Sequence, residues 1–272
     1  MSAISNLAAL QAALQKPIQK LGWGWSSLTS IAGRPSSLWQ VGPQAGTAPG
    51  TAAVPDNTTA GGILHSNGGF GQLWLPRMSM SGTLQGTLMI VDRLSQVGAI
   101  PANTNSNQAF ATAALTRYTN GYGVMMGLEI NTQIGTTATT VALTYTDAES
   151  AGSKTSPLVT IGGTNNREAG RFIQIPLAAQ DSSSEGHNGV TAVDHIQFTA
   201  TTGTAGAVSI VLYRPLLVVP IMAFEDPSIY DCIFTHGSNL PEIFDNACLA
   251  AIIWPATTAT GVIIPTLTTI ET

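Results

Sequence analysis

The chain has few charged residues: only 9% of its 272 positions are Asp, Glu, Lys or Arg, whereas an ordinary soluble domain carries about 25%. A free protein uses surface charge to remain soluble and monomeric. A surface made mainly of small neutral residues therefore indicates that neighbouring copies cover much of it. The sequence predicts a subunit of a larger assembly, and we expect a homo-oligomer, with a trimer as the expected form.

Basic residues are the scarcer sign, with 10 Lys and Arg against 15 Asp and Glu. Binding of nucleic acid requires several phosphates to be neutralised together. The nearest approach to a basic patch is the pair Arg167 and Arg171, and Glu168 stands beside them in the sequence. We therefore predict no direct contact with nucleic acid.

Cysteine is almost absent, since Cys232 and Cys248 are the only two. They are too few for the disulfide framework of a small secreted domain. With His236 they form the one group of metal-ligating residue types, but their spacing lacks the second short pair typical of zinc sites. The prediction is two reduced thiols in the core and a surface histidine, with no metal and no cofactor.

Long apolar runs are also missing. The longest uncharged stretch, residues 247–270, is interrupted by Pro255, Gly261 and Pro265, so it cannot present the roughly 20 apolar residues of a membrane-spanning helix. The first residues lack the basic region and unbroken apolar run of a signal peptide. These features predict neither a membrane span nor export by that route.

Motifs that carry catalysis are absent as well. The sequence holds no G-x-S-x-G, no P-loop and no dinucleotide fingerprint between a strand and a helix. The acidic residues within 225–245 include no marked pair of the kind a glycosidase uses. Residues 181–189 lack the regular oxygen-ligand spacing of a calcium loop. We predict a protein with no catalytic residues.

Residues 2–16 have the periodicity of a short helix. Leu7, Leu10 and Leu14 recur at steps of three and four, which places them along one face. Pro17 is expected to end the helix. We predict that these leucines form a packing face that anchors a partner.

Residues 21–62 are rich in Gly, Pro, Ala, Thr and Ser and carry Trp23, Trp25 and Trp39. Such a segment buries too little apolar surface by itself to offset the entropy of ordering it. Two interpretations are open: an extended arm whose tryptophans anchor in a partner's pockets, or a loop that folds back on its own domain. On the first, residues 1–62 form a helix and a tether, and the rest of the chain folds without them.

Beyond residue 62, short β-prone runs alternate with turn residues. The clearest is a hairpin made by 193–198, the Gly-rich turn 201–206 and 207–221. No helical segments lie between the runs, as a parallel sheet would require. The sequence therefore predicts an all-β fold, an antiparallel jelly-roll-like β-sandwich over residues 63–224.

Residues 225–272 are predicted to form a C-terminal extension with a short helix, packed on the sandwich. Pro241 is expected to open that helix over 241–249, with Asn239 as its cap. A last strand or extended tail is expected over 262–270.

The arm at 21–62 and the hairpin at 193–220 resemble structural proteins of tailed-bacteriophage virions, whose head and decoration β-domains close with similar hairpins. The resemblance implies a jelly-roll-like subunit without catalysis, repeated symmetrically in a virion that is assembled in the host cytoplasm. Because the chain lacks the long charged spine helix of a major capsid protein, an accessory or decoration role is implied. Its partners would be further copies of the chain and other virion proteins.

Other functions remain open at this point. One is a tail, collar or baseplate component of the same kind of particle. Another is a carbohydrate-binding or receptor-binding β-module, for which Tyr118, Tyr122 and Tyr145 are the candidate aromatics. A hydrolase on a sandwich scaffold is the third.

Overall fold

The computed structural model describes residues 6–16, 19–41, 44–69, 71–148, 152–178, 188–222, 227–236 and 240–272. The helices in these parts are α1 (Leu7–Leu14) and α2 (Cys232–His236). The strands, in chain order, are β1 (Gln19–Gly22), β2 (Trp25–Thr29), β3 (Ser36–Ser37), β4 (Leu73–Gly82), β5 (Gly86–Pro101), β6 (Asn107–Ala109), β7 (Met125–Thr132), β8 (Thr139–Asp147), β9 (Ser153–Thr155), β10 (Val159–Ile161), β11 (Phe172–Ile175), β12 (Val190–Phe198), β13 (Ala207–Ile221), β14 (Ser228–Asp231), β15 (Glu242–Ile243), β16 (Leu249–Pro255) and β17 (Thr260–Glu271).

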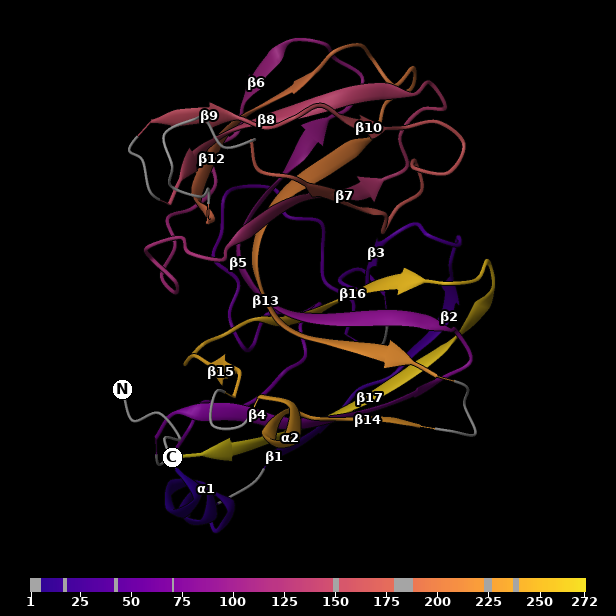
Figure 1. Cartoon of the computed structure of the whole chain (residues 1–272). Coiled ribbons are helices and arrows are strands. Elements are labelled where there is room, and N and C mark those ends of the chain that lie inside the picture. Colours follow the sequence, from indigo (N-terminus) through magenta and orange to yellow (C-terminus); the bar gives the residue numbers. More distant parts are fainter. Residues whose placement is uncertain are drawn as a thin grey trace.

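The prediction of an all-β, antiparallel fold with an N-terminal helix is confirmed. Two lobes are visible, and the long strands β5 and β13 run from one into the other (Figure 1). These strands have 16 and 15 residues and pair along almost their whole length. β7 flanks the upper part of β13, and β16 flanks the lower part of β5. One central sheet is therefore shared by both lobes.

The central sheet closes on itself as a six-stranded barrel. Its strands follow the order β11-β7-β13-β5-β16-β3, and the two ends of this order meet. The N–H of Phe172 donates to the carbonyl of Pro35 at 3.0 Å, and the N–H of Ser37 donates to the carbonyl of Gly170 at 2.8 Å. Ser36 and Arg171 form an antiparallel bridge there. We call this closure, made by residues 35–37 and 170–172, the seam.

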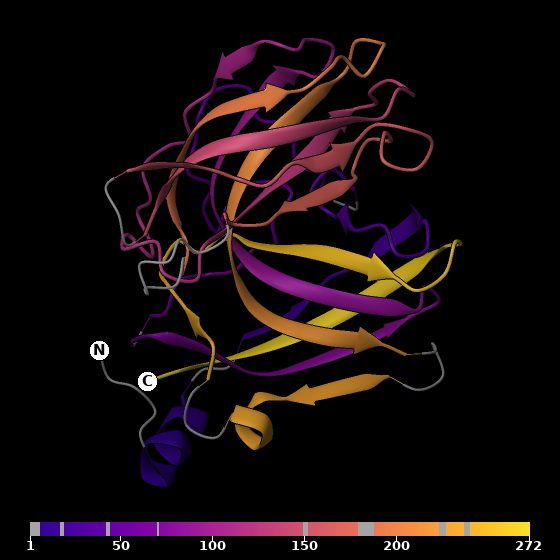
Figure 2. The same cartoon turned by 45° about the horizontal axis from the view of Figure 1, so that its top comes forward.

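Each lobe has a second sheet that covers the outside of the barrel (Figures 1 and 2). In the lower lobe it has the order β1-β17-β4-β14, with β2 paired to β17 and β15 to β4. In the upper lobe it has the order β10-β8-β12-β6, with β9 paired to β8. The fold is thus two sandwiches that share a central barrel.

Successive side chains of the central strands point to opposite faces of the sheet, and they contribute to three separate apolar cores. On β5, Leu88 and Ile90 face the lower outer sheet, whereas Met89 and Val91 face the barrel interior. Because both faces are covered, β5 has a continuous apolar run instead of an apolar-polar alternation. The barrel interior is filled by a cluster of apolar side chains: Trp39, Met89, Val91, Phe172, Val211, Tyr213, Cys248, Ala250 and Ile252.

The segments on either side of 63–224 contribute strands to the same sheets as that region. β1 and β2 pair with β17, and β17 lies between β1 and β4 in the lower outer sheet. β3 and β16 belong to the barrel. The boundaries at 62 and 224 therefore do not coincide with breaks in the hydrogen bonding of the sheets.

The prediction of a helix over residues 241–249 is wrong. Residues 242–243 form β15 against β4, and Leu249 begins β16. Ile243 and Leu249 lie in the lower core, and this burial in a sheet overrides the local helical pattern. The short helix of this region is α2, which precedes it. Pro17, Asn239 and residues 181–187 lie outside the described residues.

Within the part of the chain that the structure describes, no helix is long and apolar enough to cross a bilayer.

Candidate functional site

Two of the three tryptophans lie in the chain's own cores. Trp25 is 1% exposed and packs in the lower core, and Trp39 is 1% exposed inside the barrel. Trp23 is partly buried beside Trp25, with ring centroids 6.4 Å apart. These positions agree with the second interpretation, in which residues 21–62 fold back on their own domain. Their role as anchors for a partner stays a prediction that a binding experiment must decide.

The leucines of α1 do not all face the same surroundings. The helix packs on the lower core through Ala9, Leu10 and Ala13. The small alanine side chains allow the helix backbone to lie close to the core. Leu7 and Leu14 point away from it and are 69% and 45% exposed. Of the predicted packing face, Leu7 and Leu14 therefore remain available to a partner.

The prediction of reduced core thiols is confirmed for Cys232 and Cys248, which are free and buried. Burial raises the pKa of Cys232 to about 11 and that of Cys248 to about 12. Cys232 lies in the lower core and Cys248 in the barrel. The side chain of His236 is outside what the structure describes. Among the described residues, no group of three His, Cys, Asp or Glu side chains is placed to hold a metal.

The candidate sugar-binding tyrosines do not form one platform. Tyr145 is completely buried in the upper core, and its hydroxyl accepts from the N–H of Ala178 at 2.9 Å. Tyr118 packs edge-on against Phe244, with ring centroids 4.8 Å apart. Only Tyr122 of the three is exposed. The arrangement does not supply the set of exposed aromatic faces that sugar binding would need.

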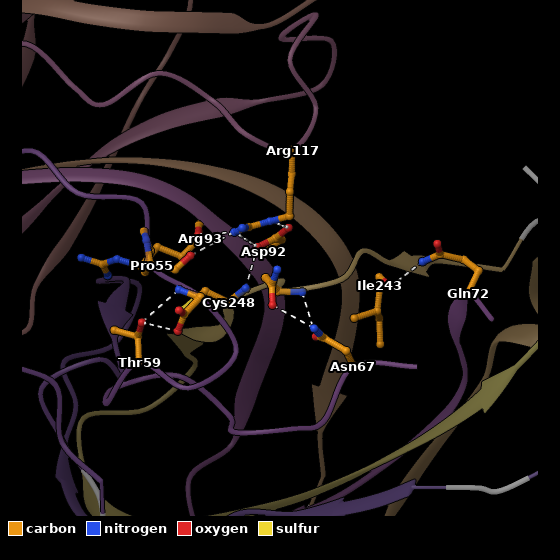
Figure 3. A network of polar contacts seen from close by, with 11 residues as sticks. Pro55, Thr59, Asn67, Gln72, Asp92, Arg93, Arg117, Ile243 and Cys248 are labelled. Carbon is orange, nitrogen blue, oxygen red and sulfur yellow. Dashed lines mark hydrogen bonds and ion pairs between the residues drawn. The ribbon is translucent and has the colours of Figure 1, made fainter. Parts of the chain in front are cut away.

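A network of buried ion pairs lies where the lobes meet (Figure 3). The guanidinium of Arg117 donates to both carboxylate oxygens of Asp92, each at 2.9 Å. Arg117 also donates to the carbonyls of Pro55 and Arg93 at 3.2 Å. The backbone N–H of Cys248 donates to Asp92 at 2.9 Å. This network ties β5 to the N-terminal segment, the loop before β7 and the start of β16.

A second ion pair stands next to the first. Arg93 donates through Nη1 to Glu129 at 2.7 Å and through Nε to Gln96 at 2.7 Å. Its guanidinium also lies over the ring of Trp39, 4.0 Å from the ring centroid. Both charged side chains are almost completely enclosed. The four charged side chains are 6% exposed or less, and each charge is offset by an opposite one in the interior.

Sequence reasoning did not find these ion pairs. Asp92 and Arg93 stand side by side in the middle of β5, directly after the apolar run of residues 88–91. Charged residues at the centre of a strand that is otherwise apolar are seldom fully buried unless paired, so their position was the available signal. It could not identify Arg117 and Glu129 as the partners, because both lie far along the chain.

The seam carries a second cluster of charges. Nε of Arg171 is 3.6 Å from Glu168, Nε of Arg167 is 3.7 Å from the same carboxylate, and Nη1 of Arg171 donates to the hydroxyl of Ser36 at 2.7 Å. The amide oxygen of Asn166, oriented to satisfy its neighbours, accepts from Arg34 at 3.3 Å. Burial lowers the pKa of Arg171, which Glu168 opposes.

Three hollows surround this cluster. A cavity of about 210 Å³ is lined by Ser36, Leu38, Glu168 and Arg171 among others. Two wider hollows of about 470 and 330 Å³ share Arg34 in their linings. Concave surface and unequal charge therefore occur together at the seam.

No protein-family model and no curated protein sequence matches the chain. Among solved structures, a chain of T=1 particles derived from infectious bursal virus is 8% identical, with a TM-score of 0.21, over 94% of this chain and 78% of that chain. For the VP2 subviral particle of infectious bursal disease virus the values are 9%, 0.19, 94% and 80%. TM-scores this low do not establish a common fold, so no property of those particles is transferred to this chain.

Proposed function

We propose that the chain is a non-catalytic structural subunit of a virus particle, and that it packs there as a symmetric homo-oligomer. The observation that carries the proposal is the charge-poor exterior. The sequence has only 10 basic and 15 acidic residues, and at least seven of these are buried: Asp92, Arg93, Arg117, Glu129, Asp147, Arg171 and Glu271. An exterior with so little charge gives weak protection against association.

The outer face of the lower sheet is one surface that fits this role. Ser79 of β4 stands between Ile229 of β14 and Thr266 of β17, and Ser81 stands beside Ile264. Alternation along β4 sends Met78 and Met80 into the core and leaves these small side chains outside. Ile229 and Ile264 are 57% and 41% exposed. Arg77 of β4 is exposed on the same face and pairs with Asp231, so the uncharged part is the patch around Ser79, Ser81, Ile229 and Ile264. Exposed isoleucines in such a patch are typical of a face that another chain covers.

The phage type and the accessory or decoration role rest on the sequence resemblance described above. On this proposal the chain resides in the virion and contacts further copies of itself and other virion proteins, and no substrate or cofactor is involved. The exposed leucines of α1 supply a second apolar contact. The enclosed ion pairs support the non-catalytic part, because a substrate would have no access to them.

The native molar mass of the purified chain tests the proposal. Size-exclusion chromatography with light scattering at tens of micromolar is expected to give one species at a small whole multiple of the chain mass, with three copies as the expected number. Double substitution of Ile229 and Ile264 with Ser is expected to weaken association, and Leu158→Ser, an exposed site of the upper lobe, is the matched control. A monodisperse monomer would contradict the proposal.

A further inference from the structure

The seam is unusual on this chain because positive charge is concentrated there. Arg34, Arg167 and Arg171 are three of only 10 basic residues. Arg34 lines the two wider hollows and Arg171 lines the cavity of about 210 Å³. The one acidic side chain among the residues that line the three hollows is Glu168. Three guanidinium groups and one carboxylate thus lie at the seam, on a chain whose net charge is -5.

The guanidinium of Arg171 is not fully satisfied within the chain. Arg171 is 4% exposed, yet its Nε has no hydrogen-bond partner, because Glu168 at 3.6 Å is too distant for a hydrogen bond. Nε of Arg167 and one carboxylate oxygen of Glu168 are also buried without a partner. Both Nε atoms lie nearest the Glu168 carboxylate, so they are enclosed with it. Arg34 is exposed and lines the two wider hollows. Its guanidinium is therefore open to a carboxylate from outside, whose two oxygens match the guanidinium fork.

Carboxylates of the same chain lie on the other side of the molecule. Glu242 of β15 is partly exposed, and Asp245 in the turn that follows is exposed. In both views β15 lies toward the left of the lower lobe, whereas β3 at the seam lies toward the right (Figures 1 and 2). Among the described residues, neither carboxylate forms an ion pair with another side chain of the chain.

We propose that the arginine-lined seam receives the acidic turn 242–245 of a second copy of this chain. A basic face and an acidic face on opposite sides of one subunit make a head-to-tail contact, and repetition of such a contact closes a ring when the rotation permits. The inference rests on the proposed function, because it specifies one contact of the oligomer. Complementary charge fixes the register of the contact and makes its association rate depend on salt.

The test uses the full chain and compares variants of equal net charge. Arg34→Gln with Arg167→Gln removes two positive charges from the seam and leaves the buried Arg171 in place. Asn103→Asp with Asn105→Asp changes the net charge equally at an exposed loop of the upper lobe. Sedimentation at 50 mM and 500 mM NaCl gives the dissociation constant of the oligomer, and thermal unfolding confirms that each variant is folded.

We expect the seam variant to dissociate at least tenfold more readily than the wild type at 50 mM NaCl, with less difference at 500 mM, and the loop control to stay within twofold. A charge swap identifies the partner segment. Arg34→Glu and Arg167→Glu on their own are expected to block association, and addition of Glu242→Lys and Asp245→Lys to the same chain is expected to restore it.

Each failure has a separate meaning. If the Arg34→Gln, Arg167→Gln variant associates as well as the wild type, the seam contact is overturned, while the proposal of an oligomer is not. A folded charge-swap variant that stays dissociated would overturn the assignment of the acidic turn. A wild type that is monomeric under all conditions would overturn the proposed function and this inference together.

Discussion

Trp39 lies under the guanidinium of Arg93, with 4.0 Å between the guanidinium carbon and the ring centroid. Trp39 comes from the N-terminal segment and Arg93 from β5 at the centre of the barrel. The indole N–H donates to the carbonyl of Thr47 at 3.1 Å. Gly61 approaches the ring so closely that a Cβ there would lie 2.5 Å from it, and its φ is +98°. The segment is therefore fitted to the barrel interior and held there by stacking on a buried charge.

Replacing Trp39 tests this fit. We expect Trp39→Ala to lower the free energy of unfolding by about 3–5 kcal/mol, the usual cost of emptying a large aromatic site. Trp39→Phe keeps a ring under Arg93 and is expected to cost less. Trp23→Ala, at a partly buried site, is the control with a smaller expected loss. Urea unfolding measures the differences, and a particle-binding assay shows whether attachment changes independently. Unchanged stability with lost attachment would favour the partner-anchor interpretation.

Deletion of residues 1–62 is expected to prevent folding, in contrast to the expectation from composition. The deletion removes β1, β2 and β3, opens the barrel at the seam and empties the sites of Trp25 and Trp39. Losses of about 3–5 kcal/mol at each tryptophan approach a typical total stability of about 5–15 kcal/mol. Far-UV circular dichroism and protease resistance of the truncated chain measure the outcome. A cooperatively folded truncation would show that the strands from residue 63 onward are sufficient.

Local sequence patterns were sufficient for the strands with strong apolar content. The run 207–221 predicts a strand and forms β13, because its aliphatic and β-branched residues favour a pleated, buried surface. The seam could not be predicted in this way. β3 has only two residues, Ser36 and Ser37, and its pairing depends on residues 170–172, far along the chain. Closure of the barrel is thus a consequence of tertiary contacts and has no local signature.

The candidate site also has features that the sequence predicts and one that only the structure shows. Burial of Cys232 and Cys248 follows from residue type alone, since free cysteine is among the most buried residues. The arginine pair at 167 and 171 was visible in the sequence with Glu168 beside it. The third arginine, Arg34, joins them only because β3 closes the barrel, so the excess of positive charge at the seam required the structure.

Neutralising Asp92 tests the ion-pair network. Asp92→Asn leaves Arg117 buried without a compensating charge, and loss of one partner of a buried pair costs about 3–5 kcal/mol. We expect a decrease of this size in the free energy of unfolding from urea titration. Asp194→Asn on the partly exposed β12 is the matched control, with an expected change below about 0.5 kcal/mol. Equal effects at the two sites would show that the network adds no stability.

We expect His65 to make the stability of the fold depend on pH below about 6.5. Burial lowers the pKa of His65 below its ordinary value of 6.5, and the carbonyl of Ile63 and the carboxylate of Asp92 oppose the shift only in part. Its Nε2 is buried without a partner, so the folded state has no acceptor there to stabilise a second ring proton.

Well above pH 6.5 the ring is neutral in both states and contributes no pH dependence. Below pH 6.5 the unfolded chain takes up a proton that the folded chain does not, so stability is lost as the pH falls, by at most about 1.4 kcal/mol per pH unit from this residue. We expect His65→Gln to flatten the slope of unfolding free energy between pH 6.5 and 5. Parallel slopes for the wild type and His65→Gln would assign the pH dependence to other groups.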